Sequence, residues 1–541
     1  MTTGASRGLE IIPDVLSRAG VGSVFAMLGG TNVPWVAQGV KQDKFRFVRT
    51  RHEETAVGGA VGYSRTTGGV GVCTVTRGPG FANSINALIT AVHNHVPIVL
   101  FVGESPPTAR WTPQVLDQRG ICEIIGAGFR HVSSTDELED ACWQSVADAC
   151  SRGVPQVVSI GDGVMSGVAM MSNQTAPPPR PASEIDQDNL NTVVDLLATC
   201  ERPLVLAGRG AMLAGCRADL EELANVVGAN VASTLAANRF FSGHPRDLGV
   251  CGNLSMRGPR EVIGTSDVVL SVGASLNDYT TAKMKAFGDA KVVQVEIDDE
   301  AEVKSSSHEL ALLGDAREVA QALLEAWKTR GLPSRQSHDR IPTRADVRRT
   351  ILGVDLGHDP KRGLDSRQVY AWLDDHLPPD RIVVTDGGRA VGGPTASLVD
   401  ARDASSWVTG TSFQSIGQGL GLAIGAAVAH PERSVVLLCG DGGFMMATSG
   451  LDTVRLEGLS NLTIVVMNDQ MYATELKYLR EFSLPHDIVE QEMADIPLLA
   501  AAYGGIGKVV RTMEELDRLD LDGPTFRIFD IRIDQIDTLN L

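Results

Sequence analysis

The sequence contains no apolar run long enough to cross a membrane. A membrane-spanning helix needs roughly 20 consecutive apolar residues, and no stretch of this chain reaches that length. The first residues, MTTGASRGLEIIPDVL, also lack the basic start and the long apolar core of a signal peptide. We therefore expect a cytoplasmic protein that does not associate with membranes.

Paired-cysteine motifs and an excess of basic residues are also missing. The eight cysteines are scattered and form no CxxC pair, so reduced thiols are expected rather than a disulfide framework. The formal net charge is −18, which disfavours binding to nucleic acids or anionic membranes because both require a basic surface. Hydrophobic residues make up 43% of the chain, a composition typical of a globular protein with an ample hydrophobic core.

Short apolar, β-branched runs alternate with helical patterns along the whole chain. Such runs are typical of strands that are buried on both faces of a parallel sheet. Two stretches resemble linkers, because Thr175–Ser183 is rich in proline and residues 330–363 are polar and charged. We predict an α/β fold with three consecutive doubly wound parallel-sheet domains, at residues 1–174, 184–330 and 364–541. The expected strands include Val70–Thr76, Ile98–Val102, Leu204–Ala207, Val268–Val272, Val292–Ile297, Ile382–Thr385, Val435–Cys439 and Leu462–Met467.

The strongest local signal lies in the third block. One predicted strand runs directly into the turn Gly440–Gly443, whose N–H groups can approach a phosphate closely. Asp441 in this turn, together with an oxygen of Asn468 or Asp469 after the next strand, can bind a hard cation. Mg²⁺ suits such a site because it prefers one or two carboxylates together with phosphate oxygens. A Gly-Asp-Gly triplet alone would indicate only a turn, but the second strand and its polar pair favour a metal–diphosphate site.

This segment resembles the thiamine diphosphate motif of acetolactate synthases, pyruvate decarboxylases, benzoylformate decarboxylases and benzaldehyde lyases. The family motif ends in Asn-Asn, whereas this chain has Asn468-Asp469. Counting without gaps from Asp441 places Asn468 at the ligand position. Matching MNDQMY to the family's MNNGxY pattern instead places Asp469 there and brings Tyr472 into register, which we prefer. The metal ligands implied by the resemblance are Asp441, Asn468 or Asp469, and a main-chain carbonyl, that of Met471 or Gln470.

Two further segments resemble regions that hold the cofactor's pyrimidine in this family. RHEETAVGGAVGYSR, residues 51–65, is similar to the family's RHE…A…GYAR segment, and the catalytic glutamate maps to Glu53. It would hydrogen-bond the pyrimidine N1′ and stabilise the imino tautomer. Ile416 lies where a bulky apolar residue bends the cofactor, and the carbonyl of Gln414 would accept a hydrogen bond from the 4′-amino group. The implied cofactor contacts are Glu53, Pro79, Asn83, Gly388, Gln414, Ile416, Gly440, Asp441, Gly442, Gly443, Asp469, Met471 and Tyr472.

Three positions bear on the reaction and on further cofactors. Gln118 lies where pyruvate decarboxylases have histidines, and a glutamine there resembles acetolactate synthases, benzaldehyde lyase and oxalyl-CoA decarboxylases. Its amide could donate to a substrate carbonyl, or it could be an exposed helix start. Glu475 lies at the offset of an active-site glutamate in pyruvate decarboxylases, and it could relay a proton or be an exposed carboxylate. Ser275 replaces an arginine that FAD-binding relatives often carry, so we interpret the central domain as structural, without FAD.

We predict a thiamine diphosphate- and Mg²⁺-dependent 2-oxo-acid decarboxylase/carboligase similar to acetolactate synthases, acting through a C2 ylid and an enamine on small 2-oxo acids or aldehydes. One alternative is an aldehyde lyase that cleaves or joins acyloins without decarboxylation. The other is a non-catalytic subunit of the same fold, against which Glu53, Asp441 and Ile416 argue. Glu53 and Asp441 lie on different domains, and the family builds its sites between subunits. The resemblance therefore implies a homodimer or homotetramer with active sites at subunit interfaces.

Overall fold

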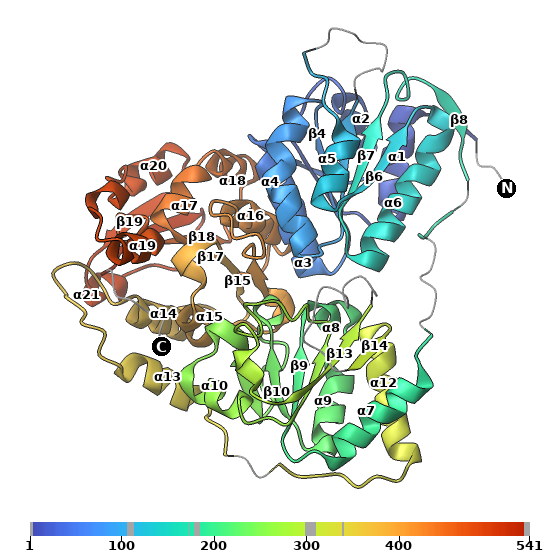
Figure 1. Cartoon of the computed structure of the whole chain (residues 1–541). Coiled ribbons are helices and arrows are strands. Elements are labelled where there is room, and N and C mark those ends of the chain that lie inside the picture. Colours follow the sequence, from blue (N-terminus) through green and yellow to red (C-terminus); the bar gives the residue numbers. More distant parts are fainter. Residues whose placement is uncertain are drawn as a thin grey trace. The chain divides into compact units, whose positions relative to one another are not determined.

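A computed structural model describes residues 4–104, 113–172, 174–177, 184–297, 310–337 and 340–534 of the chain. The chain forms two compact units (Figure 1). Residues 178–183 of the predicted linker Thr175–Ser183 lie outside the described part. The three domain boundaries drawn from the sequence remain a prediction. The first unit comprises Met1–Arg180, Ile382–Ala390 and Val408–Arg532, and the second comprises Pro181–Arg381, Val391–Trp407 and Ile533–Leu541.

Three six-stranded sheets form the framework, one in each predicted block. The first has the order β3-β2-β4-β5-β7-β6, with β2 (Ser23–Ala26), β3 (Arg46–Arg49), β4 (Gly71–Val75), β5 (Ile98–Gly103), β6 (Gly128–Val132) and β7 (Gln156–Ile160). The central one has the order β11-β10-β9-β12-β13-β14, with β9 (Pro203–Ala207), β10 (Asn230–Ser233), β11 (Asp247–Val250), β12 (Val268–Val272), β13 (Lys291–Glu296) and β14 (Leu310–Leu313). The third has the order β16-β15-β17-β18-β20-β19, with β15 (Ile382–Thr385), β16 (Trp407–Thr409), β17 (Val435–Gly440), β18 (Leu462–Asn468), β19 (Ile506–Val510) and β20 (Arg527–Arg532). A separate antiparallel pair joins β1 (Ala5–Arg7) to β8 (Val168–Met170).

Helices connect these parallel strands. In the first block they are α1 (Gly8–Arg18), α2 (Val33–Lys41), α3 (Glu53–Thr67), α4 (Pro79–His93), α5 (Gln118–Ile125) and α6 (Leu138–Arg152). The second unit contains α7 (Gln187–Thr199), α8 (Arg209–Ala214), α9 (Arg217–Val227), α10 (Arg257–Ile263), α12 (Ala316–Thr329), α13 (Arg344–Gly353), α14 (Ser366–His376) and α15 (Gly393–Leu398). The third sheet is accompanied by α16 (Gly419–Ala429), α17 (Asp441–Met446), α18 (Gly450–Glu457), α19 (Leu476–Glu481), α20 (Ile496–Ala502) and α21 (Met513–Leu516). The prediction of three α/β domains with parallel sheets is confirmed, and each strand expected from the sequence is present to within one residue at either end.

The first and third sheets share one strand order. In the third sheet the chain moves outward from β15 to β16, then crosses back past β15 to β17 and continues to β18 in the opposite direction. Right-handed crossovers then place helices on both faces of the sheet. The order reverses between β15 and β17, and ligands of such sheets bind beyond the carboxyl ends of the strands at this reversal. The turns that follow β15 and β17 are therefore the expected place for a ligand.

Within the first unit, α3 lies against α16 with their backbones in close contact (Figure 1). A methyl group on Gly62 would lie 2.0 Å from the carbonyl oxygen of Leu422, and one on Gly425 would lie 2.0 Å from that of Gly59. No side chain fits at these distances, so glycine is required on both helices. The contact joins the first block to the third, because each helix belongs to a different sheet.

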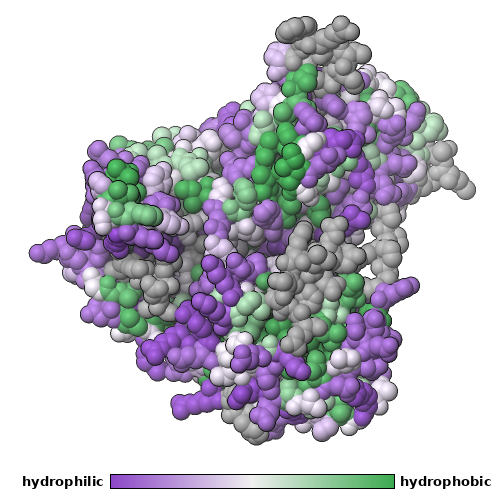
Figure 2. Space-filling model, viewed as in Figure 1, coloured by the Kyte–Doolittle hydropathy of each residue, from purple (hydrophilic) through white to green (hydrophobic). Residues whose placement is uncertain are grey.

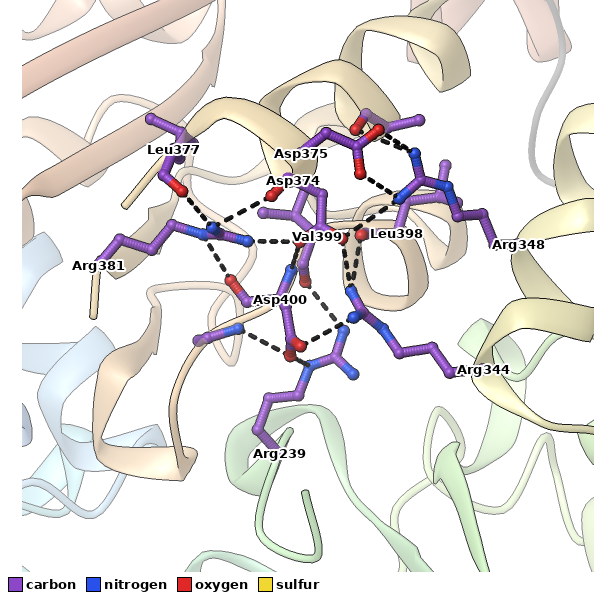
Figure 3. A network of polar contacts seen from close by, with 12 residues as sticks. Arg239, Arg344, Arg348, Asp374, Asp375, Leu377, Arg381, Leu398, Val399 and Asp400 are labelled. Carbon is purple, nitrogen blue, oxygen red and sulfur yellow. Dashed lines mark hydrogen bonds and ion pairs between the residues drawn. The ribbon is translucent and has the colours of Figure 1, made fainter. Parts of the chain in front are cut away.

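A network of arginines and aspartates organises part of the second unit (Figure 3). The Asp374 carboxylate accepts hydrogen bonds from Arg344 of α13 and from the buried Arg381, and Arg344 also pairs with Asp400 at 2.8 Å. Helix α13 lies inside the stretch 330–363 that was expected to be a linker. Its apolar face is short, and ion pairs to α14 hold it in place instead. The sequence pattern did not predict it, because those partners lie outside the helix.

The surface hydropathy and the cysteines follow what the composition indicates. On the face shown in Figure 2, hydrophilic residues predominate and apolar ones gather over the region of α4 and α5, where Ile124 is 86% exposed. All eight cysteines are unpaired thiols, and seven of them are buried. Among the described residues, no helix is both long enough and apolar enough to span a membrane.

Replacing Gly62 by alanine should destabilise the first unit. The new methyl group would overlap the Leu422 carbonyl, and overpacking of this kind costs about 1–3 kcal/mol or more. Chemical denaturation of Gly62→Ala measures the loss. Gly353→Ala in α13 is the control, because a methyl group there meets nothing within 4 Å. Equal stability of the two variants would contradict the close helix contact.

Candidate functional site

The turn that follows β15 is tied to the start of α16 by a buried carboxylate. Asp386 is 2% exposed, and its two oxygens accept hydrogen bonds from the main-chain N–H groups of Gly417 at 2.8 Å and Gly419 at 3.0 Å. Burial raises the pKa of Asp386, and these N–H donors oppose that rise. Asp386 also packs against the turn after β17, since a methyl group on Gly443 would lie 2.1 Å from its Oδ2. One side chain thus holds three turns together.

The loop before α16 carries the predicted pyrimidine contacts. Ile416 is partly buried and packs against the Gly387-Gly388 turn. Gln414 is exposed and has a φ of 60°, a left-handed conformation that costs non-glycine residues on the order of 1–3 kcal/mol. Such strain is concentrated at ligand sites. The sequence predicted Gln414 and Ile416 as cofactor contacts. The structure places Ile416 beside the predicted Gly388, and Gln414 lies two residues earlier in the same loop.

The glycines of the turn after β17 allow other groups to lie very close to its backbone. Asp441 is the first residue of α17, so the N-terminal N–H groups of this short helix point toward the turn. Gly442 lies under the ring of Tyr472, and a methyl group on it would be 2.5 Å from the tyrosine Cε1. The predicted residues from Gly440 to Gly443 and Tyr472 are therefore brought together at one edge of the sheet.

Two carboxylates that follow adjacent strands interact at this edge. Asp441 is 3% exposed, its Oδ1 accepts a hydrogen bond from the N–H of Gly442, and its buried Oδ2 has no hydrogen-bond partner. Burial raises the pKa of Asp441. Burial also raises the pKa of Asp469 to about 7, with a further contribution from the charge of Asp441 and an opposing one from Arg389. A hard cation binds carboxylate oxygens, and this edge offers two carboxylates, one of which has a buried oxygen without a hydrogen-bond partner.

Asn468 is occupied by other contacts. Its Nδ2 donates to Asp530 at 2.7 Å, and its Oδ1 accepts from the N–H of Gln470 at 3.1 Å. The carbonyl of Gln470 accepts a hydrogen bond from the N–H of Gln491 at 2.7 Å. The gapless alternative for the metal ligands uses these two residues. The contacts therefore favour the other alignment, in which Asp469 and the carbonyl of Met471 are the ligands.

The predicted glutamate begins α3. Glu53 is partly buried, and its Oε2 accepts a hydrogen bond from the exposed Asn83 at 3.1 Å. The neighbouring Glu54 accepts one from Asn86, whose amide also donates to Ser415 of the third block at 2.9 Å. The start of α3 and the loop before α16 therefore meet within one chain. The predicted Pro79 is the first residue of α4, and Gly80 lies next to Glu53.

The two proposed substrate residues differ in environment. Gln118 is 4% exposed; its Nε2 donates to the carbonyl of Gly103 and its Oε1 accepts from Ser159, both at 2.8 Å. This rules out the exposed helix start and gives the amide a fixed orientation. Glu475 is exposed at the end of a short 3-10 helix. Catalytic roles for both residues remain predictions.

The residues present fit a diphosphate–metal group. A glycine turn lies at the reversal of the strand order, and a buried carboxylate oxygen there lacks a partner. Among the described residues, no three His, Cys, Asp or Glu side chains form a metal cluster. The expected site needs only two carboxylates, since a main-chain carbonyl and phosphate oxygens would complete the coordination of Mg²⁺.

Comparisons with known proteins identify the family. Family models for thiamine pyrophosphate enzymes match the chain in order: the N-terminal TPP-binding domain at residues 6–121, the central domain at 190–323 and the C-terminal TPP-binding domain at 390–520. The chain belongs to the thiamine pyrophosphate (thiamine diphosphate) enzyme family. It is accordingly a thiamine diphosphate-dependent enzyme that acts on carbon–carbon bonds, as the sequence predicted.

Curated relatives and a solved structure extend this family match. The chain is 29% identical to an acetolactate synthase of Arthrospira platensis, over 85% of this chain and 82% of the relative. It is 28% identical to a probable 2-ketoarginine decarboxylase of Pseudomonas aeruginosa, over 94% and 89%. A thiamine diphosphate-dependent 4-hydroxybenzoylformate decarboxylase of Rhodococcus jostii superposes with a TM-score of 0.83, covering 98% of this chain and 100% of that chain at 20% identity. This last likeness shows the fold of the family enzyme.

Two residues of this site were not predicted from the sequence. The sequence singled out Gly388 but not Asp386 two residues before it, although the Asp386 carboxylate holds the start of α16. Arg389, three residues further on, pairs with Asp469 at 3.0 Å. An acidic residue immediately after a buried strand was the available signal for Asp386. No pattern in the sequence links Arg389 to Asp469.

Replacing Asp386 by asparagine should weaken both the fold and cofactor binding. The amide keeps one acceptor oxygen and sets an N–H₂ against a main-chain N–H, which leaves a buried donor unpaired and costs about 1–3 kcal/mol. Denaturation and calorimetric titration with thiamine diphosphate and Mg²⁺ measure the two effects. Asp380→Asn, in an exposed pair with Arg402, should change neither. Wild-type affinity and stability in Asp386→Asn would remove its anchoring role.

Proposed function

We propose that this chain is a Mg²⁺-dependent 2-oxo-acid decarboxylase/carboligase of the acetolactate synthase type. The observation that carries the metal and diphosphate part is the partnerless, buried Oδ2 of Asp441 beside the second carboxylate of Asp469. The relatives named acetolactate synthase and 2-ketoarginine decarboxylase, which align with most of this chain, support the reaction class. Asp441, Asp469 and the carbonyl of Met471 would hold the metal.

The chain's own residues supply positions for a proton and for the substrate. When bound, thiamine diphosphate supplies the carbanion chemistry that breaks or makes a bond next to a carbonyl. Glu53 would hold a proton at the pyrimidine N1′, and the Gln414 carbonyl would accept a hydrogen bond from the 4′-amino group. Ile416, which packs on the Gly387-Gly388 turn, would hold the bound cofactor in its bent conformation. Gln118, fixed by Ser159, would orient a substrate carbonyl.

We also propose that the protein forms a homodimer or homotetramer. The apolar residues over α4 and α5, with Ile124 largely exposed, support an association surface on this face (Figure 2). Sedimentation of the purified chain measures the oligomeric state.

A substrate screen tests the reaction. Purified protein with thiamine diphosphate and Mg²⁺ should release CO₂ from a small aliphatic or aromatic 2-oxo acid and form an acyloin when an aldehyde is added. Acyloin cleavage or synthesis from aldehydes alone, without CO₂ release from any 2-oxo acid, would favour the aldehyde lyase instead. Binding of the cofactor without turnover of either class would favour a non-catalytic subunit.

Glu53→Gln should retain cofactor binding and lose most exchange of the cofactor's C2 proton. The amide has the size of the carboxyl group but cannot transfer its proton to N1′. NMR of C2–H/D exchange on the bound cofactor measures this rate, and calorimetry measures the affinity. Glu54→Gln is the matched control, since Glu54 contacts Asn86 instead of Asn83. Exchange at the wild-type rate in Glu53→Gln would remove Glu53 from the mechanism.

A further inference from the structure

Arg389 and Asp469 form an ion pair across the carboxyl edge of the third sheet. Arg389 lies just after β15 and Asp469 just after β18, so the pair spans the intervening strand β17 and its Asp441. The Arg389 Nη1 lies 3.0 Å from the Asp469 Oδ2, and the two side chains are 24% and 7% exposed. This geometry is that of a partly desolvated, charge-assisted hydrogen bond.

The ion pair compensates a second negative charge that Asp469 adds beside Asp441. The family motif described above has an asparagine where this chain has Asp469, so the usual set of side-chain ligands carries one negative charge and this one carries two. A second buried carboxylate beside Asp441 is costly unless a cation lies close to it. Arg389 is that cation, and its guanidinium restores the net charge of an amide-containing site.

We propose that Arg389 is a positioning residue that balances the charge of Asp469 and holds its carboxylate in place, so that an aspartate serves where relatives use an amide. The inference rests on the proposed metal site. It makes the two residues a coupled pair: Arg389 is needed only as long as position 469 is acidic. A purely structural arginine, or one that acted on the cofactor independently, would not show this dependence.

A double-mutant cycle tests the coupling. Mg²⁺ affinity at saturating thiamine diphosphate would be measured by calorimetry for wild type, Arg389→Gln, Asp469→Asn and the double variant. Loss of a residue that supports a metal ligand weakens binding by about 10–100-fold, and this is expected for Arg389→Gln. Asp469→Asn should weaken binding as well, because the guanidinium of Arg389 then lies unbalanced beside the cation, and the double variant, which restores the net charge, should lose less than either single variant.

Arg389→Lys, which keeps the charge, should lose less than Arg389→Gln. Equal losses in Arg389→Gln and the double variant would overturn the proposal.

A second readout needs no cofactor. Denaturation of the four proteins in a metal chelator should show a lower midpoint for Arg389→Gln and recovery of that midpoint in the double variant. Arg455→Ala, in an exposed pair with Asp452, is the control and should change neither readout. If wild type bound no thiamine diphosphate, the proposed function would fail, and Arg389 would lose its role at a metal site even if the stabilities were coupled. Additive stabilities with normal wild-type binding would overturn the pairing alone.

Discussion

Buried carboxylates at the carboxyl edge of the third sheet determine how the site is built. Asp386 accepts main-chain hydrogen bonds from the start of α16 and packs on the turn after β17, so the loops that carry Ile416 and Asp441 are fixed relative to each other. The parallel sheet makes this possible, because strand ends far apart in sequence share one edge. The glycines next to these carboxylates let the turns approach one another closely.

The same edge is electrostatically unfavourable when no ligand is bound. Burial raises the pKa values of Asp386, Asp441 and Asp469, and Arg389 is in contact with one of the three carboxylates. Left-handed backbone at Gln414, with a φ of 60°, adds local strain. A bound divalent cation would relieve the repulsion between these carboxylates, so its binding would contribute stability as well as chemistry. Proteins commonly depart from local rules at functional sites and compensate for the cost elsewhere.

The sequence was sufficient for the framework and for part of the site. Strands such as Ile382–Thr385 could be predicted because both faces are buried and the apolar run is unbroken. The motif around Asp441 could be predicted because its glycines and carboxylate are adjacent in the chain. Contacts between distant segments could not: the pairing of Arg389 with Asp469, and the ion pairs that hold α13, depend on which strands and helices become neighbours. For the same reason, the burial of Gln118 is visible only in the fold.

Asp441 and Asp469 are the proposed ligands of a divalent cation that holds the diphosphate at the Gly440–Gly443 turn. Crystals grown with thiamine diphosphate and Mn²⁺ test this assignment directly through the anomalous signal of the metal. One strong peak is expected about 2.1 Å from a carboxylate oxygen of each aspartate, with the Met471 carbonyl and diphosphate oxygens completing the coordination. A metal bound through Asn468 instead of Asp469, or a diphosphate bound away from this turn, would contradict it.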